Sequence, residues 1–131
     1  MRGVLVAAAL AGPAAAADVP TPQGAWELVR INGQRAPVTA TLRLEKDRVS
    51  GRAFCNGFDG GYRIRSGRLL ARQVSATKML CDRQDGFDTM AAEREFLGTL
   101  SAQPRLKLGP EGLFLRAENG DTLQFRRSRT R

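Results

Sequence analysis

The residues that could do chemistry in this chain are few, and its two cysteines come first. Cys55 and Cys81 are the only cysteines among 131 residues, and histidine is absent. The absence of histidine removes the commonest general base and metal ligand, and it excludes Ser–His and Cys–His nucleophilic catalysis. Two cysteines alone do not complete a zinc site, and they lie much farther apart than in a Cys-x-x-Cys redox motif. The pair therefore favours a structural disulfide over a catalytic one.

Three aspartates form the only other spacing that suggests a ligand site. Asp82, Asp85 and Asp88 recur at every third position. A calcium site needs more oxygen ligands at a different loop spacing. Negative charge at the start of a helix is favourable by about 0.3–1 kcal/mol. We therefore expect these residues to lie around the start of a helix that Asp85 caps, and we expect no metal and no cofactor.

The residues after the first cysteine tolerate positive φ, which predicts a turn from Cys55 to Gly61. Asn56 either binds a ligand from an exposed position or bonds the local backbone to hold this turn, and the second role is favoured. Thr77 has the same two alternatives. The motif and turn residues are Gly51, Asn56, Gly57, Gly60, Gly61, Tyr62, Thr77 and Met79.

The N-terminal segment has the layout of a secretory signal peptide. A basic start precedes an apolar run that is too short to span a bilayer, followed by an Ala-x-Ala ending. We expect residues 1–17 to be cleaved after Ala17, unless they form an Ala-rich disordered leader or follow a mis-assigned start codon. No cysteine follows the run, so no lipid anchor is expected. A periplasmic or secreted location would oxidise the cysteines, whereas a cytosolic protein would keep two separate buried thiols.

The formal net charge of +8 comes mainly from arginines that are spread along the chain. This distribution does not indicate a nucleic-acid interface, and we expect no nucleic-acid partner. The last residues, 127–131, form a basic tail that either approaches anionic surfaces or is a solvated end. An extended lead-in over 18–23 precedes one domain over 24–126, which we expect to be monomeric.

Period-two alternation and β-branched or aromatic content predict strands through most of the domain. Leu42 and Leu44, for example, share one face of a half-buried strand. Asn32-Gly33 and Asn119-Gly120 are hairpin signals. Residues 73–81 show neither period, so a loop is expected there. The predicted strands are 26–31, 39–45, 49–53, 62–65, 69–71, 105–108, 113–115 and 123–126.

One helix is predicted between the strands, beginning near Gly86 and ended by Pro104. Its expected apolar face consists of Phe87, Met90, Ala91, Leu97 and Leu100. Strands, a late helix and more strands define an α+β fold. We expect a small antiparallel, partly barrel-like sheet in which the covering helix closes the gap.

Several of these residues together resemble the META domain family, which includes the HslJ-type heat-shock proteins. The matching elements are Trp26-Glu-Leu28 with Asn32-Gly33, Ser50-Gly51, Cys55-Asn56, Gly61-Tyr62, Ala76-Thr77-Lys-Met79-Leu-Cys81, Glu93 with Phe96 and Leu100, and Leu123-Gln-Phe125. The resemblance covers residues 24–125. It implies a role in envelope stress or antibiotic tolerance, with no established enzymatic reaction. The family usually has Gly before Cys-Asn; here Phe54 stands there, so we expect a relaxed version of that turn.

Three functional hypotheses follow. The first is a non-enzymatic periplasmic protein that supports envelope stress tolerance by binding. The second is a carrier or sensor of a hydrophobic small molecule or lipid in a cleft between sheet and helix. The third is an inhibitor or chaperone-like partner of another envelope protein, acting through the loop from Cys55 to Tyr62. An acyl-sized cavity would favour the second, and a filled core with a rigid loop the third. The candidate cleft lining is Trp26, Phe54, Tyr62, Met79, Phe87, Met90 and Leu97.

Overall fold

The computed structural model describes residues 21–36, 40–82 and 87–129. The predicted signal peptide over 1–17 and the predicted cap Asp85 lie outside the described residues. Within the described ranges, no helix combines the length and the apolar character that crossing a bilayer requires.

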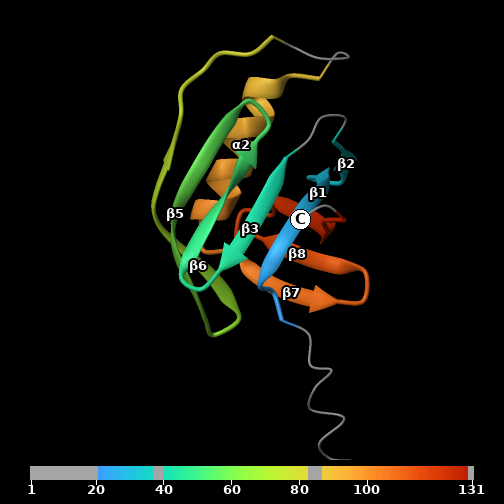
Figure 1. Cartoon of the computed structure of the whole chain (residues 1–131). Coiled ribbons are helices and arrows are strands. Elements are labelled where there is room, and N and C mark those ends of the chain that lie inside the picture. Colours follow the sequence, from blue (N-terminus) through green and yellow to red (C-terminus); the bar gives the residue numbers. More distant parts are fainter. Residues whose placement is uncertain (1–20, 37–39, 83–86, 130–131) are drawn as a thin grey trace, which may run out of the picture.

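Over the described residues, one antiparallel sheet and one helix make up the fold (Figure 1). Neighbouring strands pair in the order β2-β1-β3-β4-β5-β6-β7-β8-β9, and β1 also pairs with β9, so the sheet curls round and closes. The predicted α+β fold with a barrel-like antiparallel sheet and one helix is confirmed. The elements are β1 Gly24–Ile31, β2 Gln34–Arg35, β3 Thr41–Glu45, β4 Arg48–Ala53, β5 Asn56–Arg65, β6 Arg68–Ala76, α2 Thr89–Ser101, β7 Arg105–Gly109, β8 Gly112–Arg116 and β9 Thr122–Arg127.

The shortest pairing between neighbouring long strands of the sheet joins β6 to β7, and we call it the seam. These strands pair at one position, Arg68 opposite Arg105. The hydrogen bonds Leu69 N to Pro104 O and Leu106 N to Gly67 O flank that pair, both at about 2.8–2.9 Å. The connection between the two strands contains α2, which packs against β6 and also touches β4, β8 and β9. The helix therefore covers the sheet beside its weakest pairing.

Phe96 of α2 anchors the helix in the core. Its ring lies 5.7 Å from Phe58 and 6.1 Å from both Phe54 and Phe125, measured between ring centroids. Burying an aromatic or leucine side chain stabilises a fold by about 1.5–3 kcal/mol. The other fully buried side chains of the core include Trp26, Leu42, Leu44, Val49, Leu69, Leu100, Leu113, Leu115, Leu123 and Phe125.

The helix differs from its prediction in its start and in its buried face. It begins at Thr89, and Asp88 caps it by accepting a hydrogen bond from Ala91 N at 3.0 Å. Of the predicted apolar face, Leu100 alone is fully buried. The true face has helical spacing but contains three polar residues, so apolar periodicity does not reveal it. It consists of Thr89, Ala92, Glu93, Phe96, Thr99 and Leu100.

The predicted turn from Cys55 to Gly61 is wrong, because β5 begins at Asn56. The glycines serve strand packing instead. A Cβ on Gly60 would lie 2.8 Å from the carbonyl oxygen of Arg72 on β6, next to a register shift in the pairing. The loop predicted over 73–81 is also wrong in its first part, since β6 continues to Ala76. The alternation in this part is weak, because the inward residues Val74 and Ala76 are small and only half-buried between exposed Gln73 and Ser75.

The C-terminal strand holds the start of the domain in place. Arg127, assigned above to a basic tail, lies in β9. Its guanidinium stacks 4.1 Å above the Trp26 ring and donates hydrogen bonds to Gln23 O and Thr21 O, each at 2.6 Å. Trp26 Nε1 in turn donates to Pro22 O at 2.8 Å. The lead-in is thus fixed to the last strand.

Replacing Arg127 by alanine should lower the free energy of unfolding by about 1–2 kcal/mol, because it removes a cation–π contact and two charge-assisted hydrogen bonds. Arg126→Ala is the matched control. That side chain is 60% exposed and pairs with Glu27, so its loss should be below about 1 kcal/mol. Urea denaturation of both variants measures the difference. Equal losses would show that the stacked arginine is no more than a surface charge.

Candidate functional site

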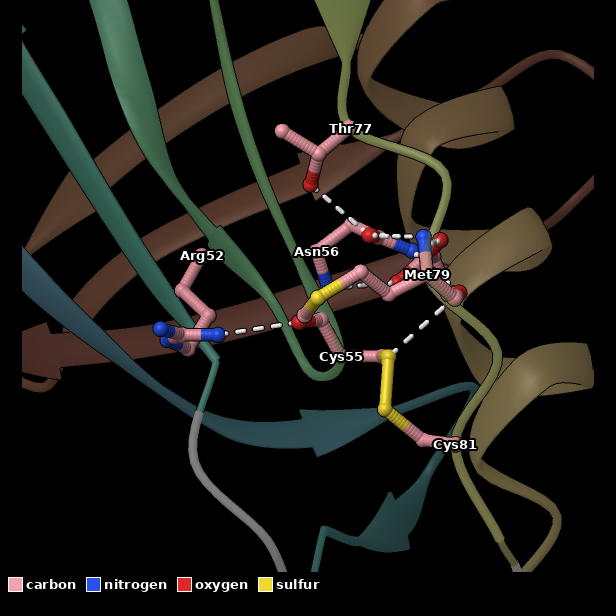
Figure 2. The surroundings of a disulfide bond; sticks show 7 residues. Arg52, Cys55, Asn56, Thr77, Met79 and Cys81 are labelled. Atoms are coloured by element: carbon pink, nitrogen blue, oxygen red, sulfur yellow. Dashed lines mark hydrogen bonds between the residues drawn. A yellow bond between two sulfur atoms is a disulfide. The ribbon is translucent and has the colours of Figure 1, made fainter.

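The site is built around the disulfide between Cys55 and Cys81 (Figure 2). The predicted bridge is confirmed, with 26 residues of separation and a Cα–Cα distance of 6.0 Å. Closing a loop of this length stabilises the folded state by about 3–4 kcal/mol in the chain-entropy model. The bridge ties the β4–β5 loop to residues 77–82, which follow β6 without regular structure. It is compatible with an oxidising compartment.

Asn56 is the centre of the hydrogen bonding beside the bridge (Figure 2). Its Oδ1 accepts from Thr77 Oγ1 and from Met79 N, both at 2.7 Å. Its Nδ2 donates to Met79 O at 3.0 Å and to Glu93 Oε2 at 2.7 Å. These four bonds use the full capacity of the amide group. Asn56 is 1% exposed, so the expectation of an exposed turn residue is wrong, while the favoured structural role fits these contacts.

Glu93 connects this network to the helix. Its Oε1 accepts from Asn56 N at 3.0 Å, so both carboxylate oxygens bond the same residue. The side chain is buried, and within the described part of the chain it forms no ion pair. Glu93 is not among the residues of the predicted helix face. Its place three residues before Phe96 and seven before Leu100 is the signal that could have shown it facing inward. We call the bonds joining Asn56, Glu93, Thr77 and Met79 the Asn56 clasp.

The loop that precedes Asn56 contains only Phe54 and Cys55, between the paired residues Ala53 and Asn56. Phe54 has a φ of 67°, and Cys55 is not among the positive-φ residues. A two-residue hairpin with positive φ at its first position has the pattern of a type II′ turn, where glycine is preferred. The expected relaxed turn is therefore wrong: Phe54 adopts the left-handed conformation. Its ring packs 5.5 Å from Phe87 and 6.1 Å from Phe96, which offsets the backbone strain.

A groove of about 510 Å³ lies between residues 74–80 and α2, and we call it the clasp groove. Its lining includes two exposed apolar side chains, Met79, which is 56% exposed, and Leu80, which is 88% exposed. Its lining consists of Asn56, Val74, Ser75, Ala76, Thr77, Lys78, Met79, Leu80, Met90, Glu93 and Leu97.

The structure separates the seven residues expected to line one cleft. Met79, Met90 and Leu97 meet in the clasp groove. Trp26, Phe54 and Tyr62 are buried in the core, and Phe87 packs against Phe54. The remaining motif glycines also have strand roles. Gly57 and Gly61 pair with β4, and a Cβ on Gly51 would overlap the carbonyl oxygen of Thr41 on β3.

This arrangement can hold residues 77–81 in a fixed position at the protein surface, where another molecule could contact them. Asn56 and the disulfide hold residues 77–81 against the barrel, while the side chains of Met79 and Leu80 face solvent. Over the three described ranges, no group of three or more carboxylate or cysteine side chains is placed to hold a metal ion. The clasp itself has no free oxygen on either Asn56 or Glu93.

Comparison with known proteins identifies the class of protein that carries this site. The META domain family model matches residues 19–130, nearly the whole chain, so the chain belongs to the META domain family. The expected resemblance is confirmed. A comparison with curated proteins finds no match.

Two solved structures share the fold. One is an NMR structure of a protein from Burkholderia xenovorans, with 26% sequence identity and a TM-score of 0.63, covering 86% of this chain and 93% of that chain. The other is an NMR structure with 19% identity and a TM-score of 0.65, covering 81% of this chain and 95% of its own.

The Asn56 clasp predicts that a second substitution, at Glu93, partly restores the stability lost on replacing Asn56. Asn56→Asp should lower the free energy of unfolding by about 3 kcal/mol or more, because it removes a donor and places a carboxylate against buried Glu93. Combining it with Glu93→Gln restores a donor to the pair. The double variant should therefore be about 1–2 kcal/mol more stable than Asn56→Asp alone. Urea denaturation of the two single variants and the double variant gives the coupling energy, and a coupling near zero would contradict the clasp.

The turn predicts that glycine is tolerated better than alanine at position 54. Both Phe54→Gly and Phe54→Ala lose the ring packing, at about 3–5 kcal/mol. Only glycine also relieves the left-handed backbone, so Phe54→Gly should be about 1 kcal/mol more stable than Phe54→Ala. At an ordinary strand position the order would be reversed. Midpoints of chemical denaturation decide between the two orders.

Proposed function

We propose that this protein is a non-enzymatic META-domain protein of the cell envelope that binds an apolar segment of another protein in the clasp groove. The observation that carries the proposal is the pair Met79 and Leu80, two large apolar side chains held exposed beside the groove. Exposed apolar side chains that adjoin one another at a groove can mark an interaction site.

The filled interior supports a protein partner over a carried lipid. The predicted lining residues Trp26, Phe54 and Tyr62 lie in the core among tightly packed neighbours. A lipid between sheet and helix would have to displace Phe96, which is fully buried against three other rings. The cleft that the carrier hypothesis needs is occupied by the side chains of the protein.

The way residues 77–81 are held supports binding through this segment. Met79 bonds Asn56 through both its N and its O, and Cys81 is covalently fixed. A segment that is already ordered loses little conformational entropy when a partner docks, which favours affinity. In Figure 1 the stretch after β6 runs alongside α2, so partner and helix would share one surface.

The chemistry of the groove defines the partner. Met79, Met90 and Leu97 offer flexible apolar surface, and methionine adapts to partners of different shape. Lys78 adds one positive charge to the lining. The fitting ligand is an apolar peptide segment with an acidic neighbour. The disulfide supports an exported location, and the envelope stress or antibiotic tolerance implied by the family is the process in which such binding would act.

The test is affinity capture of the exported, oxidised protein after mild crosslinking in cells under envelope stress. Met79→Ser/Leu80→Ser removes the apolar pair without touching the core. Ile64→Ser is the matched control, because Ile64 is 41% exposed and lies on β5, outside the clasp groove lining. We expect one captured protein to be lost in the double variant and retained in the control.

Two results would overturn this function. One is a capture pattern that is the same for wild type, the double variant and Ile64→Ser. The other is a reaction catalysed by the purified protein that Met79→Ser/Leu80→Ser leaves intact. Thermal denaturation of each variant checks that folding is unchanged.

A further inference from the structure

Four arginines lie side by side across four consecutive strands. Arg65 of β5 is opposite Arg68 of β6, Arg68 is opposite Arg105 of β7, and Arg105 is opposite Arg116 of β8. We call these residues the arginine row. Directly opposed residues of an antiparallel sheet project from the same face, and like charges in that position destabilise the pairing.

The geometry of the seam brings the middle pair closest. The hydrogen bonds Leu69 N to Pro104 O and Leu106 N to Gly67 O lie on either side of Arg68 and Arg105. This pattern makes them a non-hydrogen-bonded pair, the type in which opposite side chains approach most closely. Since β6 and β7 pair only there, two arginines occupy the one position that joins the two strands.

Little negative charge within the row compensates this repulsion. Arg68 donates to Glu118 Oε2 and to Gln103 O, each at 2.9 Å. In the described part of the chain, Arg65, Arg105 and Arg116 form no ion pair. The concentration of unpaired cations at a weak seam is a cost to stability that an anionic ligand would relieve.

An apolar groove adjoins the row. Its volume is about 790 Å³, within the range of pockets that hold small molecules. Half-buried Phe114, opposite Lys107 and on the same face as Arg105 and Arg116, supplies apolar surface. Lys107 adds a cation, and Glu111 is the carboxylate in the lining. The complete lining is Gly67, Arg105, Leu106, Lys107, Gly109, Pro110, Glu111, Phe114, Leu115, Arg116 and Thr122.

We propose that this groove binds a free organic anion with an apolar body, independently of the clasp groove. The carboxylate, sulfonate or phosphate group of the ligand pairs with Arg105 and Arg116, where guanidinium groups offer planar donors. The body of the ligand covers Phe114. Charge complementarity and the size of the groove together favour a single small molecule.

The test uses two fluorescent probes on the mature, oxidised protein. One is an anilinonaphthalene sulfonate, and the other is phenylnaphthylamine, which has a similar aromatic body without the sulfonate. We expect the sulfonate to bind more tightly, and added salt to weaken its binding. Arg105→Gln/Arg116→Gln should weaken it about five- to tenfold, the sum of two partly exposed ion pairs. Phe114→Thr should weaken both probes.

The matched control is Arg30→Gln/Arg35→Gln. These arginines are also directly opposed, in the β1–β2 pairing, and neither lines this groove. The control lowers the net charge by the same amount but leaves the groove intact. It should therefore change the affinity of the sulfonate by no more than about twofold, because distant exposed charges are screened by salt.

Three outcomes would overturn the proposal. They are equal affinity for the charged and neutral probes, equal weakening by the control and by Arg105→Gln/Arg116→Gln, and binding to vesicles of anionic phospholipid without binding of the free sulfonate. The last outcome would make the row a membrane-surface contact. Denaturation midpoints of the two double arginine variants should not fall, because each of these replacements removes a like-charge repulsion.

Discussion

The hydrogen bonding of one buried amide sets the arrangement of three separate parts of the chain. The side chain of Asn56 bonds Glu93 of the helix, and it also bonds Thr77 and Met79 in the segment after β6. Asn56 is itself the first residue of β5. A buried amide with any of these partners missing would leave unpaired polar groups in the core, at a cost of about 1–3 kcal/mol each. Helix position, hairpin turn and exposed segment are therefore set together. The disulfide beside the clasp reinforces this arrangement.

The sequence reveals the sheet better than the site. Strands such as the one containing Leu42 and Leu44 bury one face only, so their alternation is visible, and the terminal hairpins have clear turn residues. The helix face was misjudged because Glu93, Thr89 and Thr99 are buried polar residues. Glycines such as Gly60 were misread as turn residues because close strand approach and a turn both require the missing Cβ.

The site could be predicted as a set of residues but not as a geometry. The two cysteines, Asn56, Thr77 and Met79 were recognised as one motif, and the structure brings them together. That the partner of Asn56 is a glutamate from the helix depends on tertiary packing, which no local pattern encodes. The conformation of Phe54 is a further case, since a bulky residue in a left-handed turn is stable only when distant rings hold it.

The two proposed binding surfaces use opposite ends of the same strand. The arginine row crosses β6 at Arg68, and the clasp groove begins at Val74 near the other end. At about 3.3 Å per residue, these positions lie roughly 20 Å apart along the strand. A protein segment in one groove and a small anion at the other would not compete for space.

Closure of the barrel through β1 and β9 has a consequence for how the chain is made. The contact joining Glu27 to Arg126 spans 99 residues, so the outer edge of β1 stays unpaired until the last strand has been synthesised. An open edge of this kind is a template for pairing with other chains. A product shortened by even one strand would keep that edge open permanently and expose the counterparts of Leu123 and Phe125 in the core. The domain therefore becomes safe from aggregation only when it is complete.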